Sequence, residues 1–378
     1  MKMRRVVAIS DFCTRVPPDP VAAPFLDAAP PLRLEANVAV TGGYLERLPL
    51  ACVRYGLADA AEVWNFTGSD ADPVGLIASP HSIGRRRFRA DGHAPPYGSA
   101  HMLHHIRTVG EPAILCVWGL GVTQDVLAAC PNAVTIYNSL DVDALRIPVE
   151  VSRHIDIFLT GSEAQSAAVR ARHPHALIEI LPIGPEFASE KTFFPMAAEK
   201  KFDVIYVAAA QPYKRHDILF DALATLPRDV SALCVFGYGE NADALRQQAA
   251  DMGLNVTFIG PPGVPHAEVN RLMNRARLGV VCGENDGAPA ILTEYMLAGL
   301  PVLANADLSC GLQYIRADTG RVASSANFST AIAEMLADTS VYQPRKAVLD
   351  NWTWPHSMAR LAGLIERVSA SRLEGCRA

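Results

Sequence analysis

The chain has 378 residues, more than the roughly 250–300 at which one hydrophobic core stops growing, so we expect two domains. Half of the residues are hydrophobic and the net charge is -5, which disfavours nucleic acid as a partner. No stretch approaches the roughly 18 uninterrupted apolar residues of a membrane span, and the N-terminus lacks a signal-peptide pattern. The eight scattered cysteines form no CxxC pair and are typical of core residues in a reducing compartment. We therefore expect a cytoplasmic protein.

In the first half of the chain, short β-branched runs alternate with segments of helical periodicity. The runs predict strands at 4–12, 61–66, 112–120, 133–140, 155–162 and 178–184. The intervening segments predict helices at 43–56, 97–110 and 162–174. The Pro-rich segment 17–31 is predicted to be a loop.

A polar, Pro-interrupted stretch near 186–200 breaks this pattern, and a second series follows it. Its predicted strands are 202–210, 230–237, 255–260, 278–283 and 300–305. Its predicted helices are 215–226, 240–253, 265–276, 288–299 and 326–338. An amphipathic helix at 356–372 ends the pattern.

Alternation of strand and helix predicts parallel sheets with helices on both faces, because parallel strands need crossover connections. Continuously apolar strands such as "AILCVWGL" fit a sheet that is buried on both faces. We therefore predict an α/β protein with two Rossmann-like β/α/β domains. Ligands of open parallel sheets bind beyond the carboxyl ends of the strands, so the two domains are expected to face each other across a cleft.

The stretch "GENDGAPAILTEYMLAGLPVLAN", residues 283–305, combines acids with a Gly-rich turn and a helix. Free backbone N–H groups before a helix favour an anion, whereas the carboxylates of Glu284, Asp286 and Glu294 suit hydroxyl groups. A nucleotide sugar carries both phosphates and hydroxyls. The alternative from the pattern alone is that Asp286 caps the helix and Glu294 points to solvent.

This stretch resembles the donor-binding segment of retaining glycosyltransferases of family 4, which have the two-domain GT-B fold. That segment reads acid, seven residues, Glu and a "GxPV" strand, matched here by Asp286, Glu294 and "AGLPVLAN". The resemblance implies that Asp286 contacts hydroxyls of the transferred sugar and Glu294 the ribose. The family's first acid is usually Glu, so Glu284 competes for the first role. The other donor-binding residues that the resemblance implies here are Gly237, Gly287, Ala288, Pro289 and Ala290.

The segment "VIYVAAAQPYKRHDILFDAL" resembles the family's strand, loop and helix that grip the diphosphate, with Lys214 at the family's lysine position. Ala208 and Ala209 stand where the family usually has Gly-Arg, and Arg215 is the candidate substitute. Gly42 and Gly43 resemble the glycine loop of the first domain, although a double glycine also fits a plain turn.

One departure concerns the family's His near the transferred sugar, in whose place this chain has Asn138. Asn donates and accepts hydrogen bonds but carries no charge, which puts a proton-transfer role in doubt. We nevertheless count Asn138, Lys214 and Asp286 as the catalytic candidates.

Other polar clusters are weaker signals. The tripeptide "DVD" at 141–143 and the histidines His101, His104 and His105 do not complete a metal site, so no metal is predicted. The segment "RRRFR" at 85–89 fits an edge strand with its cations in water. Its alternative is a basic patch that meets a phosphate-bearing acceptor or a membrane surface through Arg85, Arg86, Arg87 and Arg89.

The sequence thus predicts a metal-independent retaining glycosyltransferase without a cofactor, using a nucleoside-diphosphate sugar as donor. The acceptor is expected to be a glycan, a lipid-linked glycan or a small-molecule glycoside. The predicted domains are 1–188 for the acceptor and 189–355 for the donor, and the resemblance implies that 356–378 packs back on the first. The alternatives are a nucleotide-sugar epimerase of the same fold and a non-catalytic relative that only binds the nucleotide sugar. Peripheral contact with the inner membrane face is an open possibility.

Overall fold

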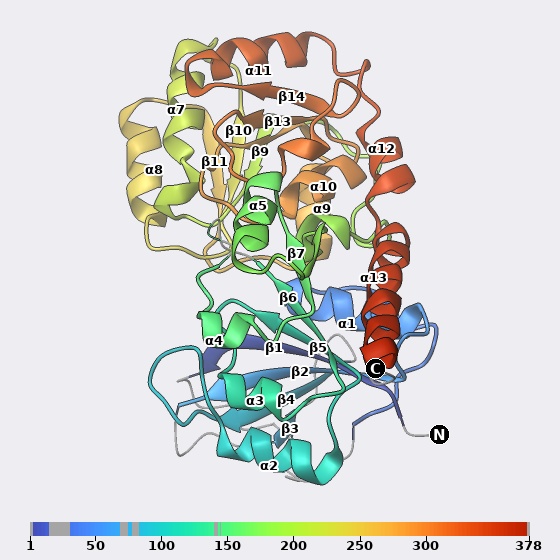
Figure 1. Cartoon of the computed structure of the whole chain (residues 1–378). Helices are drawn as coiled ribbons and strands as arrows, with labels where there is room; N and C mark the ends of the chain where they lie inside the picture. The colour runs from blue at the N-terminus through green and yellow to red at the C-terminus, as the bar shows by residue number, and fades with distance from the viewer. Residues whose placement is uncertain are drawn as a thin grey trace. The chain divides into compact units, whose positions relative to one another are not determined.

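The computed structural model describes residues 3–14, 31–68, 75–77, 83–139, 143 and 145–375. Two compact units make up the chain: residues 1–183 with 354–378, and residues 184–353 (Figure 1). The sequence-based divisions stand at 188/189 and 355/356, a few residues from these. Most of the predicted loop 17–31 and of the "DVD" tripeptide lies outside the described residues.

Within the described residues, the first unit holds an eight-stranded sheet in the order β3-β4-β2-β1-β5-β6-β7-β8. All neighbours are parallel except β3 and β4. The strands are β1 (Arg5–Thr14), β2 (Ala60–Thr67), β3 (Gly75–Ile77), β4 (Gly84–Arg89), β5 (Ile114–Trp118), β6 (Val134–Asn138), β7 (Ile157–Thr160) and β8 (Leu177–Ile180).

The helices of the first unit are α1 (Tyr44–Arg54), α2 (Ala100–Val109), α3 (Gln124–Ala128), α4 (Val149–Ser152), α5 (Glu163–Arg172) and α13 (Trp354–Gly375). The C-terminal helix α13 belongs to this unit and lies beside α1 (Figure 1). Its apolar stripe, including Met358, Leu361 and Leu364, is buried. Arg372 on the same helix donates to the carbonyls of Asn132 and Ala133, which ties the end of α13 to the sheet.

The prediction that "RRRFR" forms an edge strand with its cations in water is wrong. β4 pairs on one side with β2 and on the other with β3, so it is not an edge strand. Strand alternation turns Arg86 inward, where it is 1% exposed and forms an ion pair of 3.0 Å with the fully buried Glu62. Arg85 pairs with Glu46, and Arg89 is the exposed arginine of this strand. Arg86 is therefore a core residue that no membrane or acceptor reaches.

The second unit, as described, holds a six-stranded parallel sheet in the order β11-β10-β9-β12-β13-β14. Its strands are β9 (Phe202–Val207), β10 (Ala232–Val235), β11 (Val256–Ile259), β12 (Ala276–Val281), β13 (Val302–Asn305) and β14 (Gly320–Ala323). Its helices are α7 (His216–Thr225), α8 (Ala242–Asp251), α9 (His266–Met273), α10 (Ile291–Leu297), α11 (Phe328–Ala337) and α12 (Pro344–Asn351). The four-residue helix α6 (Ile183–Glu186) spans the division between the units.

Two hydrophobic clusters cover the two faces of this second sheet. Val204 and Tyr206 of β9 join residues of α7, α8 and α11, whereas Ile205 between them joins residues of α9, α10 and α12. Consecutive strand side chains point to opposite faces, so a strand with helices on both sides must be apolar throughout. This requirement explains why the strands of both units could be recognised as continuous apolar runs.

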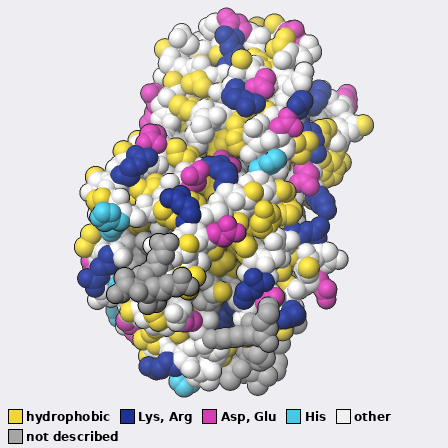
Figure 2. Space-filling view, turned by 45° about the vertical axis from the view of Figure 1, so that its right-hand side comes forward, with side chains coloured by type: hydrophobic (Ala, Val, Ile, Leu, Met, Phe, Trp, Pro, Cys, Tyr) yellow, Lys and Arg dark blue, Asp and Glu magenta, His cyan; other side chains and the backbone are white. Residues whose placement is uncertain are grey.

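The surface drawn in Figure 2 mixes basic and acidic side chains, with hydrophobic side chains between them. This mixture is consistent with the modest net charge. Among the described residues, no helix is both long and apolar enough to cross a membrane.

A buried histidine makes the stability of the second unit depend on pH. His216 is 2% exposed, its ring lies between those of Tyr206 and Phe236, and neither ring nitrogen has a hydrogen-bond partner among the described residues. Burial, with a smaller effect of Lys214, lowers its pKa to about 4. An unfolded His takes up a proton near pH 6.5, so the unfolded chain binds more protons between pH 6.5 and 4. Folding stability is therefore lost as the pH falls through this range.

We predict that His216→Phe will flatten this loss, because phenylalanine keeps the aromatic contacts and does not titrate. A pKa lowered to about 4 corresponds to roughly 3 kcal/mol at pH 4, so the variant should gain on that order relative to the wild type there. Urea unfolding at a series of pH values measures the effect, with the exposed His101→Gln as control. A wild-type slope in His216→Phe would show that the acid sensitivity arises elsewhere.

Candidate functional site

The candidate site of the second unit lies where two loops leave neighbouring strands of the sheet. β9 and β12 are adjacent in the sheet, and the strand order runs outward from them in opposite directions. Their following loops, residues 208–215 and 282–290, therefore diverge at the carboxyl edge of the sheet. This is the topological switch point at which open α/β sheets bind ligands.

Backbone contacts hold these two loops together. The N–H of Glu284 donates to the carbonyl of Tyr213 at 3.1 Å, and the hydroxyl of Tyr206 donates to the carbonyl of Lys214 at 2.6 Å. Gly283 permits this approach, since a Cβ there would lie 3.2 Å from the carbonyl oxygen of Tyr213. Lys214 thus starts from a fixed backbone position, at the end of a 3₁₀ turn over Pro212–Lys214.

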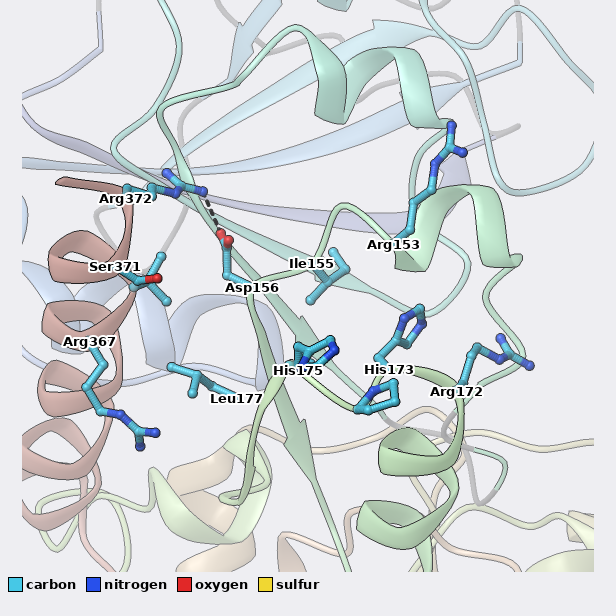
Figure 3. A pocket seen from close by; sticks show the side chains of 13 residues that line it. Arg153, Ile155, Asp156, Arg172, His173, His175, Leu177, Arg367, Ser371 and Arg372 are labelled. Atoms are coloured by element: carbon cyan, nitrogen blue, oxygen red, sulfur yellow. Dashed lines mark hydrogen bonds and ion pairs between the residues drawn. The ribbon is translucent and has the colours of Figure 1, made fainter. Parts of the chain in front are cut away.

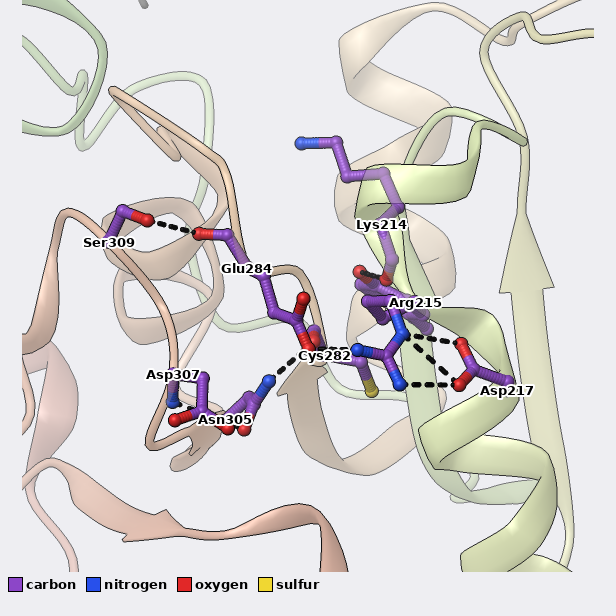
Figure 4. A network of polar contacts seen from close by, with 9 residues as sticks. Lys214, Arg215, Asp217, Cys282, Glu284, Asn305, Asp307 and Ser309 are labelled. Carbon is purple, nitrogen blue, oxygen red and sulfur yellow. Dashed lines mark hydrogen bonds and ion pairs between the residues drawn. The ribbon is translucent and has the colours of Figure 1, made fainter. Parts of the chain in front are cut away.

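Charged side chains pair across the junction of the two loops. Lys214 forms an ion pair with Asp286, and both side chains are largely buried. Arg215, in the left-handed region with a φ of 50°, bonds Asp217 at 2.7 Å and also pairs with Glu284 (Figure 4). The hydrogen bonds that Arg215 donates to Asp217 raise the pKa of Arg215 and lower the pKa of Asp217. Asp286 and Glu284 are therefore brought to one place, each with its own cation.

The network has more negative than positive charge. The two cations, Lys214 and Arg215, face the three carboxylates of Asp217, Glu284 and Asp286. A ligand diphosphate would find both cations already paired. Such a network favours a ligand that offers donors to the carboxylates at the same time as it offers anionic oxygens to the cations.

A second set of bonds fixes the backbone around Glu284. Ser309 donates to the carbonyl of Glu284 from its N–H at 2.8 Å and from its hydroxyl at 2.7 Å (Figure 4). The side chain of Asn305, at the end of β13, donates to the carbonyl of Cys282 at 3.0 Å. The acidic turn is therefore held from the β13 side as well as from the β9 side.

The helix after the acidic turn begins later than the sequence pattern suggests. Gly287, Ala288 and Pro289 form a buried connection, and α10 starts at Ile291 with Ala290 as its N-cap. Asp286 forms an ion pair with Lys214, and no side-chain cap is formed at the N-cap. Glu294 is 8% exposed, so it does not point into bulk solvent. Both features disagree with the alternative that Asp286 only caps the helix and Glu294 points to solvent.

Two tyrosines that sequence analysis did not select lie beside Lys214. The Lys214 ammonium is 4.8 Å from the ring centroid of Tyr213, within cation–π range. Tyr213 also shares a side-chain hydrogen bond with Tyr238, which is 62% exposed and follows Gly237. Burial raises the pKa of Tyr213. Their positions in the sequence could have identified them: Tyr213 directly precedes Lys214, and Tyr238 lies between the two glycines of "GYG".

The predicted residues of the first unit stand in a different environment. The N–H of Gly43, the N-cap of α1, donates to the carboxylate of Glu46 at 2.9 Å, and Gly42 has a φ of 88°. Asn138 ends β6 and is fully buried; its Oδ1 accepts from the N–H of Ile183 at 3.2 Å. Its Nδ2 has no partner among the described residues. The N–H of Gly43 and the side-chain carbonyl of Asn138 are therefore both hydrogen-bonded within the protein.

The described residues contain no group of three or more side chains that could hold a metal ion. His105 is buried against Trp64 and Phe88, whereas His101 is exposed. The histidines of α2 therefore do not converge.

Comparisons with known proteins match a family model to most of the second unit. Residues 188–347 match the family model described as glycosyl transferases group 1. A curated relative from Mycolicibacterium smegmatis, GDP-mannose-dependent alpha-(1-6)-phosphatidylinositol monomannoside mannosyltransferase, is 27% identical over 184 residues. That match covers 43% of this chain and 47% of the relative, so the chain matches about half of the relative's length.

Solved structures match nearly the whole chain. Sucrose-phosphate synthase from Thermosynechococcus elongatus gives a TM-score of 0.69 at 16% identity and covers 97% of this chain and 100% of its own. The Anabaena protein HepE, in a structure with UDP and glucose, gives 0.66 at 17% identity with coverage of 97% and 100%. These likenesses show the fold, and the predicted GT-B fold is confirmed.

Two glycines in the loop after β10 should respond very differently to substitution. Gly239 has a φ of 123°, and a Cβ there would lie 2.4 Å from the carbonyl oxygen of Ala210, which accepts from the N–H of Asn241. We predict that Gly239→Ala will lower the free energy of unfolding by more than about 1 kcal/mol, through backbone strain and this clash. Denaturant unfolding measures it.

The matched control is Gly237→Ala, because a Cβ at Gly237 meets nothing within 4 Å. Its stability should stay close to that of the wild type. Equal stabilities for the two variants would show that the loop tolerates a side chain at Gly239 and is not tied to Ala210.

Proposed function

We propose that this protein is a retaining glycosyltransferase that takes a sugar from a nucleoside-diphosphate donor bound by the second unit. The observation that carries the proposal is the pairing of Lys214 with Asp286 at the switch point of that sheet. The match of residues 188–347 to glycosyl transferases group 1 supports it, since that range contains both residues.

In this proposal the donor exchanges partners with the network when it binds. The diphosphate takes Lys214 and Arg215, and the sugar hydroxyls donate to Asp286, which Lys214 has left. Glu294 accepts from the ribose, and Gly237 with the turn Gly287–Ala290 surrounds the rest of the donor. The exchange gives Lys214 and Asp286 new partners, which matters because both side chains are largely buried.

During transfer the bond between the anomeric carbon and the β-phosphate oxygen breaks, and its electron pair leaves with the nucleoside diphosphate. The acceptor oxygen forms its bond to the same face of the anomeric carbon, and its proton passes to the leaving phosphate. Lys214 and Arg215 stabilise the growing negative charge of that phosphate. We propose that these two cations do this without a metal ion, so chelators should not reduce activity.

The acceptor is proposed to be a glycan, a lipid-linked glycan or a small glycoside, bound by the first unit. The named substrates of the relatives give the first donors to test: GDP-mannose, from the name of the mycobacterial relative, and UDP-glucose, after the UDP and glucose in the HepE structure. Arg86 is buried and takes no part in contact with a membrane surface or an acceptor.

Substitutions in the network should reduce turnover far more than stability. Hydrogen bonds to charged groups contribute about 1.5–3 kcal/mol, so Asp286→Ala or Glu294→Ala should lower kcat/KM for the donor roughly tenfold to a hundredfold. Lys214→Ala should cost at least as much, because its partner gains charge in the transition state. Steady-state kinetics with the Tm of each variant test this. Glu284→Ala is the matched control and should be milder.

If Glu284→Ala lost most of its kcat/KM for the donor while Asp286→Ala stayed active, the acid that binds the sugar would be Glu284. Normal turnover in all four variants would show that these residues do not form the transferase site. Donor binding without transfer to any acceptor would favour the binding-only alternative, and conversion of the donor alone would favour the epimerase.

The partner exchange itself makes a distinct prediction. Asp286→Asn leaves Lys214 without its counter-charge, so the affinity for a nucleoside diphosphate that lacks a sugar should rise, about threefold or more, while donor turnover falls. Titration calorimetry with UDP and GDP measures the affinity, with Glu284→Gln for comparison. Weaker binding in Asp286→Asn would mean that the carboxylate does not compete with the diphosphate for Lys214.

A further inference from the structure

A pocket of about 600 Å³ lies in the first unit, between α13 and the segments that lead into β7 and β8 (Figure 3). Arg367, Ser371 and Arg372 line it from α13, and Arg172, His173 and His175 line it from the segment that ends α5. Arg153, Ile155 and Asp156 line it from the segment that leads into β7. Pockets of this size are typical of small-molecule sites.

The pocket is at the opposite edge of the sheet from the carboxyl ends of the strands. Ile155 and Asp156 directly precede β7, and Leu177 is the first residue of β8, which runs parallel to β7. These are the amino ends of the two strands, whereas Asn138 stands at the carboxyl end of β6. A ligand in this pocket would therefore not occupy the edge at which acceptor binding is proposed.

The charge of the lining residues is strongly positive in a chain of net charge -5. Four arginines and one carboxylate line the pocket. Asp156 is already engaged, because its Oδ2 accepts from Arg372 at 2.8 Å and from the N–H and hydroxyl of Thr135 at 2.8 Å each. This leaves Arg153, Arg172 and Arg367 without a carboxylate partner within the lining.

The three remaining arginines have little or nothing to neutralise them. Arg153 donates to the amide oxygen of Gln124 at 2.8 Å, and Arg172 donates to the carbonyl of Ile147 at 3.1 Å. Both partners are uncharged. Arg367 has no hydrogen bond or ion pair among the described residues. The side walls of the pocket therefore carry guanidinium charge that is available to a ligand.

Compensation of helix dipoles is the simpler explanation for arginines at helix ends. α4, α5 and α13 all end near the pocket, and each helix C-terminus carries at most about half a negative elementary charge. Three such ends amount to no more than about one and a half charges, against three arginines without acidic partners. A positive excess remains, and dipole compensation gives no reason for the arginines to surround a concave space.

We propose that this pocket binds the phosphate group of a phosphorylated ligand. Guanidinium groups offer several N–H donors each and match the oxygens of a phosphate. Ser371 adds a hydroxyl donor and His175 adds ring nitrogens (Figure 3), whereas the Nε2 of His173 is already bonded to the hydroxyl of Ser152 at 2.9 Å. The phosphate belongs either to a free small molecule or to a lipid headgroup. The site is independent of glycosyl transfer, since it shares no residue with the network of the second unit.

The test uses the full chain and two probes. Inorganic pyrophosphate is titrated by calorimetry, and phosphatidylcholine vesicles with or without phosphatidylglycerol are used in flotation. Arg367→Glu and His175→Glu reverse or add charge on opposite walls of the pocket at exposed positions. Arg107→Glu, on the exposed side of α2, is the matched control for net charge. All titrations are repeated in a Lys214→Ala background, which removes the main cation of the second unit, and each variant's Tm is recorded.

We expect pyrophosphate to bind, and the binding to persist in the Lys214→Ala background. Arg367→Glu and His175→Glu should each weaken it at least tenfold, with Arg107→Glu close to wild type. Binding only to vesicles with phosphatidylglycerol, with the same pattern of variants, would support the pocket and assign the phosphate to a lipid. Absence of binding to both probes would overturn the proposal. So would equal losses in Arg367→Glu and Arg107→Glu, or complete loss in Lys214→Ala.

Discussion

The second unit depends on one constraint: β9 and β12 are hydrogen-bonded neighbours, and the chain leaves them toward opposite halves of the sheet. The loops that follow β9 and β12 therefore run in opposite directions from the carboxyl edge of the sheet. At that edge they are still close enough for the N–H of Glu284 to donate to the carbonyl of Tyr213. Lys214 and Asp286 come from the two sides of this junction and meet in a largely buried ion pair. Separating the two side chains would leave each charge buried without a partner, which is energetically costly. The ion pair is therefore expected to persist until a ligand supplies new partners.

The excess of carboxylates in this network has a consequence for specificity. A bare diphosphate must separate Lys214 from Asp286 and leaves that acid without a partner, whereas a sugar diphosphate brings hydroxyl donors to it. Under the proposed function, the network distinguishes the donor from its leaving group by charge balance. The resemblance to family 4 glycosyltransferases implies an arginine at the position of Ala209, and under the proposed function a further fixed cation there would favour the bare diphosphate.

The first unit contains an ion pair that is completely buried in its core. Glu62 lies at 0% exposure and takes bonds from Trp64 at 2.7 Å and from Arg86 at 3.0 Å, so its charge is held inside the core. Arginines that look like a surface patch in the sequence are thereby divided between the core and the surface. Four further arginines of this unit line the pocket at the amino ends of β7 and β8, beside α13.

The sequence by itself determined the strands and helices, because periods of 2 and 3.6 residues are local properties of a chain in a sheet covered on both faces. It also determined which short segments hold Lys214, Asp286 and Glu294. It missed the short elements β3, α3, α4, α6 and β14, which have too few residues to show a period, and it also missed the eight-residue helix α12. Only the tertiary structure decided which charges meet. Lys214 and Asp286 are 72 residues apart, and the walls of the α13 pocket come from segments about two hundred residues apart. The burial of Arg86 was likewise decided by the tertiary structure, because its partner Glu62 lies on the neighbouring strand β2.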